Sequence, residues 1–101
     1  MSVLGERLKQ ARLKSGLSQE QLGLQAGLEV ESASARMNRY ERGTRVPGVD
    51  LMVRVGDVLN LPPTYFYAQS EDEARLLVLY HRMSSEDKKK LLQFAEKSAI
   101  T

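Results

Sequence analysis

The chain has no cysteine and only one histidine, His81. Disulfide bonds and thiolate metal sites are therefore excluded, and a lone histidine with no evident carboxylate partners does not make a metal site. No apolar run approaches the roughly 20 residues that cross a bilayer. Residues 1–7 also lack the basic-then-apolar order of a signal peptide. We therefore expect a cytoplasmic protein with no metal, no cofactor and no membrane association.

The groups that carry catalysis are missing as well. The sequence has no glycine-rich phosphate loop and no paired acids that would share a cleft. Neither a Cys/His set nor a Ser/His/Asp set can be assembled from it. We expect a binding protein and not an enzyme.

Positive charge is concentrated in one short stretch. The 101 residues carry a net charge of only +2, yet Arg36, Arg39, Arg42 and Arg45 lie close together with a single acid, Glu41, among them. Residues 68–101, in contrast, have equal numbers of basic and acidic side chains. A local basic stripe of this kind is typical of a surface that contacts phosphates.

Apolar periodicity and capping signals predict helices and no strands. Leu4, Leu8 and Ala11 form one face of a first helix. Residues 18–21 form a capping box that opens a second, and a third begins between residues 31 and 34. Glycines end all three. The five helices expected to close around one core lie at about residues 2–15, 18–26, 31–42, 49–59 and 63–66.

Residues 68–101 are expected to form a helical hairpin appended to a domain of residues 1–67. Capping signals predict helices over about residues 70–82 and from residue 84 onward. The stretch from Leu76 to Tyr80 is apolar throughout, and a helix that is apolar all round is usually covered on more than one side. Since a two-helix tail cannot supply that cover, we expect a partner subunit there. The expected dimer interface is Leu76, Leu77, Val78, Leu79 and Tyr80.

Several motifs occur in the order found in the lambda-repressor-like family, also called the XRE family of helix-turn-helix regulators, which the chain resembles. They are Leu17–Leu22 (LSQEQL), Ala26–Leu28 (AGL), Arg39–Gly43 (RYERG), and Pro47 with Leu51. They extend over about two thirds of the chain. The resemblance implies an all-α fold, a five-helix lambda-repressor-like DNA-binding domain, here with a two-helix C-terminal extension. It also implies binding to double-stranded DNA.

Periodicity within the third helix favours the same interpretation without the resemblance. At 100° per residue, Ala33, Met37 and Tyr40 share one side, which we expect to face the core. The opposite side carries Ser34, Ala35, Asn38, Arg39 and Arg42. Small residues let a helix enter the major groove, roughly 12 Å wide, where asparagine can pair with adenine and arginine with guanine. The alternative is a solvated basic face.

The resemblance also implies roles for individual residues. It places Ser34, Ala35, Asn38 and Arg39 on base edges. Phosphate contacts are expected from Gln19, Arg42, Thr44 and Arg45, and from Arg36 because it lies toward the flank of the helix. Finally, the resemblance pairs Arg12 with Glu41 inside the domain. Glu41 would otherwise repel DNA, so we interpret it as a residue that positions the recognition helix.

The chain departs from the family pattern between Gly27 and Gly43, where it has several additional residues, most simply placed at positions 28–32. Either the turn is longer or the third helix gains an extra N-terminal turn. Glu29 and Glu31 would weaken DNA binding unless they cap that helix or accept a hydrogen bond from cytosine, and we favour capping.

The sequence therefore predicts a transcriptional regulator, and a repressor in its simplest form. It would bind a pseudo-palindromic operator as a homodimer, with two recognition helices about 34 Å apart. No effector domain is present, so no response to a small molecule is expected. One alternative is an antitoxin-type autoregulator whose C-terminal helices bind a partner protein. Another is a helical adaptor that does not bind DNA.

Overall fold

The computed structural model describes residues 2–100, and every regular element in that range is a helix. The elements in chain order are α1 (Val3–Lys14), α2 (Gln19–Gln25), α3 (Ala33–Arg42), α4 (Val49–Leu59), the 3-10 helix η1 (Pro63–Tyr67), α5 (Glu71–Arg82) and α6 (Ser85–Ser98). This confirms the expected all-α class. No helix among the described residues is both long and apolar enough to span a membrane.

Local signals set the helix ends. The Ser18 Oγ accepts a hydrogen bond from the Gln21 amide at 3.0 Å, and the Gln21 Oε1 accepts one from the Ser18 amide at 2.8 Å, which completes the capping box before α2. Gly43 has φ of 77° and closes α3 in the left-handed conformation that glycine adopts without strain. These local interactions fix where α2 begins and where α3 ends.

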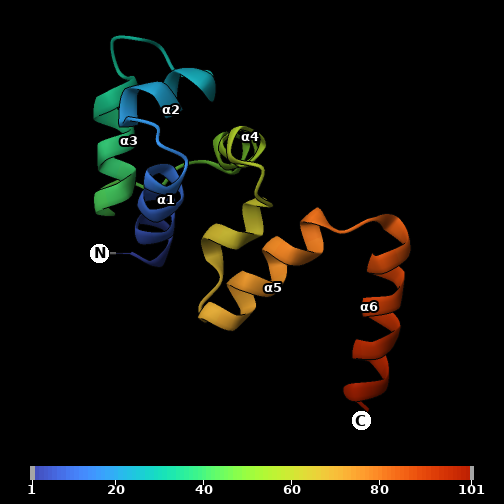
Figure 1. Ribbon diagram of the computed structural model, residues 1–101. Helices are drawn as coiled ribbons and strands as arrows, with labels where there is room; N and C mark the ends of the chain where they lie inside the picture. The colour runs from blue at the N-terminus through green and yellow to red at the C-terminus, as the bar shows by residue number, and fades with distance from the viewer. Residues whose placement is uncertain (1, 101) are drawn as a thin grey trace.

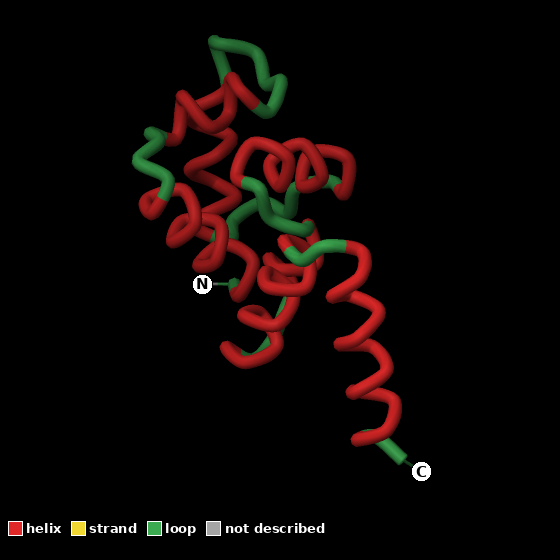
Figure 2. Tube along the Cα trace, turned by 45° about the vertical axis from the view of Figure 1, so that its right-hand side comes forward, coloured by secondary structure: helices red, strands yellow, loops and turns green. Residues whose placement is uncertain are grey.

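The core lies where α1, α2, α3, α4 and η1 meet, and these elements cluster together in Figures 1 and 2. The largest fully buried side chains are Leu8, Leu22, Met37, Met52, Val55 and Phe66. The backbones of α1 and α3 approach each other closely at Gly5, where a Cβ atom would collide with the carbonyl oxygen of Glu41. This packing supports α3 from behind and leaves its other side open.

The structure differs from the expected hairpin of residues 68–101. Helix α5 lies against the domain, because Ala74 is buried and Val78 packs on the core. Arg7 of α1 also donates hydrogen bonds to the carbonyl oxygens of Ala68 (2.9 Å) and Ser70 (3.3 Å). The chain then turns at Met83, and α6 diverges from α5 and projects from the body in both views (Figures 1 and 2).

Helix α6 lies outside the core. None of its residues is buried. A contact that holds it to α5 is the Lys88 ammonium, 5.2 Å from the centre of the Tyr80 ring. The molecule is accordingly elongated, measuring 50 × 26 × 22 Å.

Candidate nucleic-acid interface

Helix α3 has one buried side and one open side. Ala33 and Met37 are fully buried and Tyr40 is 7% exposed, which confirms the core side predicted from periodicity. Ser34, Ala35, Arg39 and Arg42 are exposed, and Asn38 and Arg36 are half-buried. The side chains expected to read bases therefore share the open side of a helix whose other side is held in the core.

The additional residues before α3 lengthen the turn and do not extend the helix. The Glu29 carbonyl oxygen accepts hydrogen bonds from the amides of Ser32 (3.1 Å) and Ala33 (2.8 Å), so the chain folds back on itself before α3 begins. Glu29 and Glu31 are exposed, and the N-cap residue Ser32 makes no side-chain capping bond. The expected carboxylate cap is thus replaced by a backbone carbonyl that the longer turn brings to the Ala33 amide.

A buried polar network connects α1, α2 and α3. The Glu41 carboxylate, 2% exposed, accepts hydrogen bonds from Arg12 Nε at 2.5 Å and Arg12 Nη2 at 3.1 Å. It also accepts one from Gln19 Nε2 at 3.1 Å, and Arg12 Nη1 donates to the Leu17 carbonyl oxygen at 2.9 Å. The structure therefore brings the two members of the expected ion pair together, and Gln19 braces the same carboxylate.

A pocket of about 420 Å³ adjoins this network on the side of α3 that faces α1 and α2. Asn38 and Arg42 of α3 line it together with Ser18, Gln19 and Lys9. Because Arg12 and Glu41 neutralise each other, Lys9 and Arg42 leave the pocket positively charged. Charge of this sign beside a recognition helix suits a phosphate group.

Lys9 was missed by the sequence reasoning, although a signal for it existed. It lies three residues before Arg12 on α1, and residues at that spacing share a helix face. Since Arg12 was expected to reach Glu41 of α3, Lys9 had to point toward α3 as well.

A second pocket, of about 310 Å³, lies on the other flank of α3, beside the loop that follows it. Arg36, Arg39 and Arg45 line it with Tyr40 and Val46, and no acidic residue contributes to the lining. The Tyr40 hydroxyl accepts hydrogen bonds from Arg36 Nε at 3.2 Å and Nη2 at 2.9 Å, which hold this guanidinium in place. Three guanidiniums around one small hollow suit an anion.

Thr44 has a local structural role in addition to the expected one. Its amide and its hydroxyl both donate to the Arg39 carbonyl oxygen, at 3.0 Å and 3.3 Å, and so satisfy the C-terminal end of α3. The side chain is exposed, and the next residue along the chain, Arg45, lines the second pocket. Its contact with phosphate stays a prediction.

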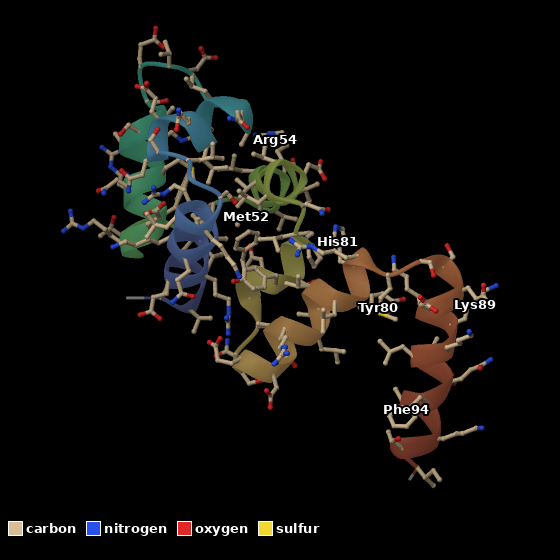
Figure 3. The ribbon with its side chains drawn as sticks, in the orientation of Figure 1. Met52, Arg54, Tyr80, His81, Lys89 and Phe94 are labelled. Atoms are coloured by element: carbon tan, nitrogen blue, oxygen red, sulfur yellow. The ribbon has the colours of Figure 1, made fainter. Side chains whose placement is uncertain are left out.

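The apolar run on α5 is divided by the fold. Leu77 and Val78 are half-buried, while Leu76, Leu79 and Tyr80 are 51%, 53% and 41% exposed. Helix α6 adds Leu92 and Phe94, which are 56% and 69% exposed, and Figure 3 shows Phe94 on α6 and Tyr80 near the end of α5. Exposed apolar side chains are therefore found on both helices. The apolar residues at positions 91, 92 and 94 were the sequence signal that could have predicted apolar side chains on α6.

Comparisons with known proteins give one consistent result. Residues 3–65 match the protein family described as a helix-turn-helix domain. An uncharacterised HTH-type transcriptional regulator of Sinorhizobium medicae (strain WSM419) is 30% identical over 64 residues, which is 63% of this chain and 43% of that protein. The HTH-type transcriptional regulator ImmR of Bacillus subtilis (strain 168) is 29% identical over 68 residues, 67% of this chain and 50% of ImmR. The chain thus spans half or less of the length of these curated relatives.

Two solved structures share the arrangement of helices. The crystal structure of the transcriptional regulator BswR aligns with a TM-score of 0.80 and 40% identity, covering 92% of both chains. The complex of SinR protein and SinI protein aligns with a TM-score of 0.59 and 22% identity, covering 97% of this chain and 82% of that one. The similarity to BswR extends over nearly the whole chain.

Proposed function

Because this chain belongs to the helix-turn-helix family of transcriptional regulators and has its lambda-repressor-like, all-α fold, we propose that it is a sequence-specific repressor that places α3 in the major groove of duplex DNA. One observation carries the proposal. The open side of α3 presents Asn38 at one positively charged pocket and Arg39 at another, while Met37 and Tyr40 anchor the same helix in the core.

Base reading is assigned to the open side of α3. Ser34 and Ala35 are small and exposed and allow close approach to the groove, whereas Asn38 and Arg39 carry the hydrogen-bonding groups. An asparagine amide matches the edge of adenine, and a guanidinium matches the edge of guanine. These four residues decide the sequence preference.

Phosphate binding is assigned to the two flanks of α3. Lys9, Gln19 and Arg42 hold one phosphate at the first pocket, and Arg36 and Arg45 hold another at the second pocket. Thr44 adds a hydroxyl next to Arg45 in the chain. Each phosphate neutralised adds about 0.9 to the slope of log affinity against log salt concentration, so binding is steeply salt-dependent.

The repressor acts in the cytoplasm as a homodimer that pairs through exposed apolar side chains of α5 and α6. The supporting observation is that α6 buries none of its residues in its own chain. An isolated helix of this length is marginal in water, so it requires a partner surface. A two-fold dimer would place two α3 helices about 34 Å apart on a pseudo-palindromic operator.

Selection of bound duplexes from a random pool tests the base-reading assignment. We expect the wild type to enrich one motif and Asn38→Ala and Arg39→Ala each to lose preference at particular base pairs, by about 1–3 kcal/mol per bidentate contact. Lys89→Ala, exposed on α6, is the matched control and leaves the motif unchanged. If the variants bind all duplexes more weakly by the same factor, the two residues contact phosphates and not bases. If the variants bind like the wild type and the affinity does not depend on salt, the adaptor is favoured.

Sedimentation analysis of Phe94→Glu, beside Lys89→Glu as the control, tests the dimer. A charge at the apolar Phe94 position dissociates the dimer, whereas Lys89→Glu, at an exposed polar position on another face of α6, does not. A monomeric wild type that co-purifies with an unrelated small protein bound to its C-terminal helices would instead favour the antitoxin-type autoregulator.

A further inference from the structure

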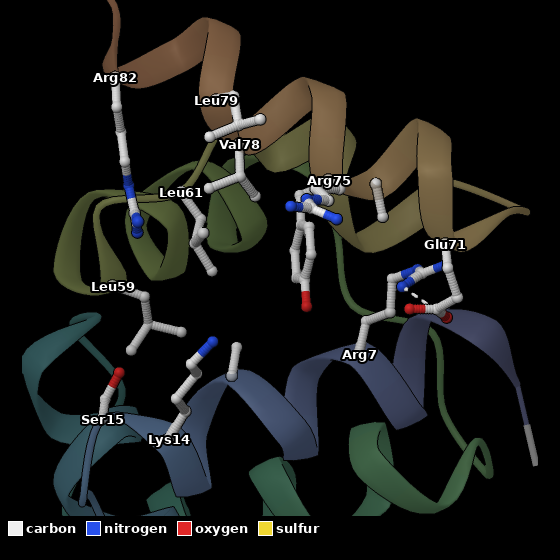
Figure 4. Close-up of a pocket in the computed structure, with 13 residues that line it drawn as sticks. Arg7, Lys14, Ser15, Leu59, Leu61, Glu71, Arg75, Val78, Leu79 and Arg82 are labelled. Atoms are coloured by element: carbon white, nitrogen blue, oxygen red, sulfur yellow. Dashed lines mark ion pairs between the residues drawn. The ribbon is translucent and has the colours of Figure 1, made fainter.

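A groove of about 430 Å³ separates α1 from α5 on the side of α1 away from α3 (Figure 4). Its apolar part includes Leu59 at the end of α4, Leu61 in the turn that follows, and Val78 and Leu79 of α5. Ligand pockets in proteins commonly have volumes of roughly 300–1,000 Å³ and predominantly apolar walls. The groove meets both criteria, and unlike the first pocket beside α3 it is lined by several aliphatic side chains.

The charged residues of the groove are unbalanced. Lys14 of α1 and Arg75 and Arg82 of α5 line it, and Figure 4 shows Lys14 and Arg82 extending toward each other from opposite walls. Its one acidic lining residue, Glu71, lies 3.4 Å from Arg7 and neutralises that guanidinium. The groove therefore has an excess of positive charge.

Within the described residues, no carboxylate neutralises the three cationic side chains that give this excess. Between residues 2 and 100, neither Lys14 nor Arg75 has a carboxylate within ion-pair distance. Arg82 donates from Nε and Nη2 to the Asn60 carbonyl oxygen, at 3.3 Å and 3.1 Å, and this bond leaves its positive charge uncompensated. Cations over an apolar floor are complementary to a molecule with an apolar body and a negative head.

We propose that the groove between α1 and α5 binds a small amphipathic organic anion, with its apolar body against Leu61, Val78 and Leu79 and its carboxylate at the cationic groups that Lys14, Arg75 and Arg82 contribute. A neutral apolar ligand would leave the cations unused, and an inorganic anion would leave the apolar floor unused. Since α1 forms one wall and α5 the other, the bound ligand contacts both the DNA-binding domain and the C-terminal helices. A response to a small molecule then requires no separate effector domain, contrary to the expectation from the sequence that the chain has no such response.

The groove is separate from the proposed DNA-binding side, so its test needs no DNA. Octanoate is the probe, with octanol as its neutral counterpart and octylammonium as its cationic one, all below their micelle-forming concentrations. Methyl resonances of the intact chain are followed during titration. Octanoate is expected to give saturable shifts at Leu61, Val78 and Leu79 and none at the remote, exposed Val46. Octanol is expected to bind at least about tenfold more weakly.

The double variant Lys14→Gln/Arg75→Gln tests the carboxylate end. Both positions are exposed, so the fold is retained, and a thermal melt verifies this. Octanoate affinity is expected to fall at least about tenfold, or about 1.4 kcal/mol, whereas the control Lys89→Gln/Lys97→Gln binds like the wild type. The proposal is overturned if octanol binds as tightly as octanoate, if the variant keeps wild-type affinity, or if no probe shifts the groove methyls.

Discussion

Replacing Glu41 by alanine removes an acceptor that three donors share in the interior. Two of these donors belong to Arg12, which is 8% exposed, and the third is the Gln19 amide. In Glu41→Ala the Arg12 guanidinium stays buried with one remaining bond, to the Leu17 carbonyl oxygen. The variant therefore contains a buried positive charge without a counter-charge.

The expected loss follows from that uncompensated charge. Removing one partner of a buried ion pair lowers the free energy of unfolding by about 3–5 kcal/mol. Domains of this size have only about 5–15 kcal/mol in total. A loss of 1 kcal/mol lowers the melting temperature by about 4–8 °C in such a domain, so Glu41→Ala is expected to melt at least about 12 °C below the wild type.

Urea unfolding followed by far-UV circular dichroism, at one fixed protein concentration, measures this loss. Glu20→Ala, at an exposed position on α2, is the matched control and is expected to change stability by less than about 0.5 kcal/mol. The double variant Arg12→Met/Glu41→Leu removes both charges and is expected to recover most of the stability lost by Glu41→Ala. A cost below about 1 kcal/mol for Glu41→Ala, as for a surface pair, or a double variant less stable than the single one, would refute the reasoning.

Two further predictions concern the packing that positions α3 and α5. Gly5→Ala is expected to lower the free energy of unfolding by about 1–3 kcal/mol in urea titrations, because its methyl group would meet the backbone of α3. The control is Gly48→Ser, which has open space at its Cβ. It is expected to lose no stability and to gain slightly, because serine is a better N-cap for α4 than glycine. Arg7→Met removes two hydrogen bonds from a charged group to backbone carbonyls and is expected to cost about 1.5–3 kcal/mol and to speed hydrogen exchange across α5. Glu71→Gln, which alters only the exposed end of the ion pair, is expected to cost less than about 1 kcal/mol and to leave that exchange unchanged.

Local interactions explain why much of the fold could be predicted from the sequence. The capping box at Ser18 and Gln21 and the left-handed Gly43 involve neighbours a few residues apart, so the pattern alone placed these ends. The buried side of α3 followed from 3.6-residue periodicity, since Met37 and Tyr40 must share a face wherever that helix packs.

Tertiary contacts decided the rest, because those contacts join residues far apart in the chain. The bond from Arg7 to the Ala68 carbonyl links residues 61 positions apart, and it helps to place α5 on the domain and not in a hairpin with α6. The same docking brings Lys14 opposite Arg75 across the groove and divides the apolar run that the sequence presents as continuous. Periodicity tells which side of a helix is buried, but only the packed structure determines which element covers it.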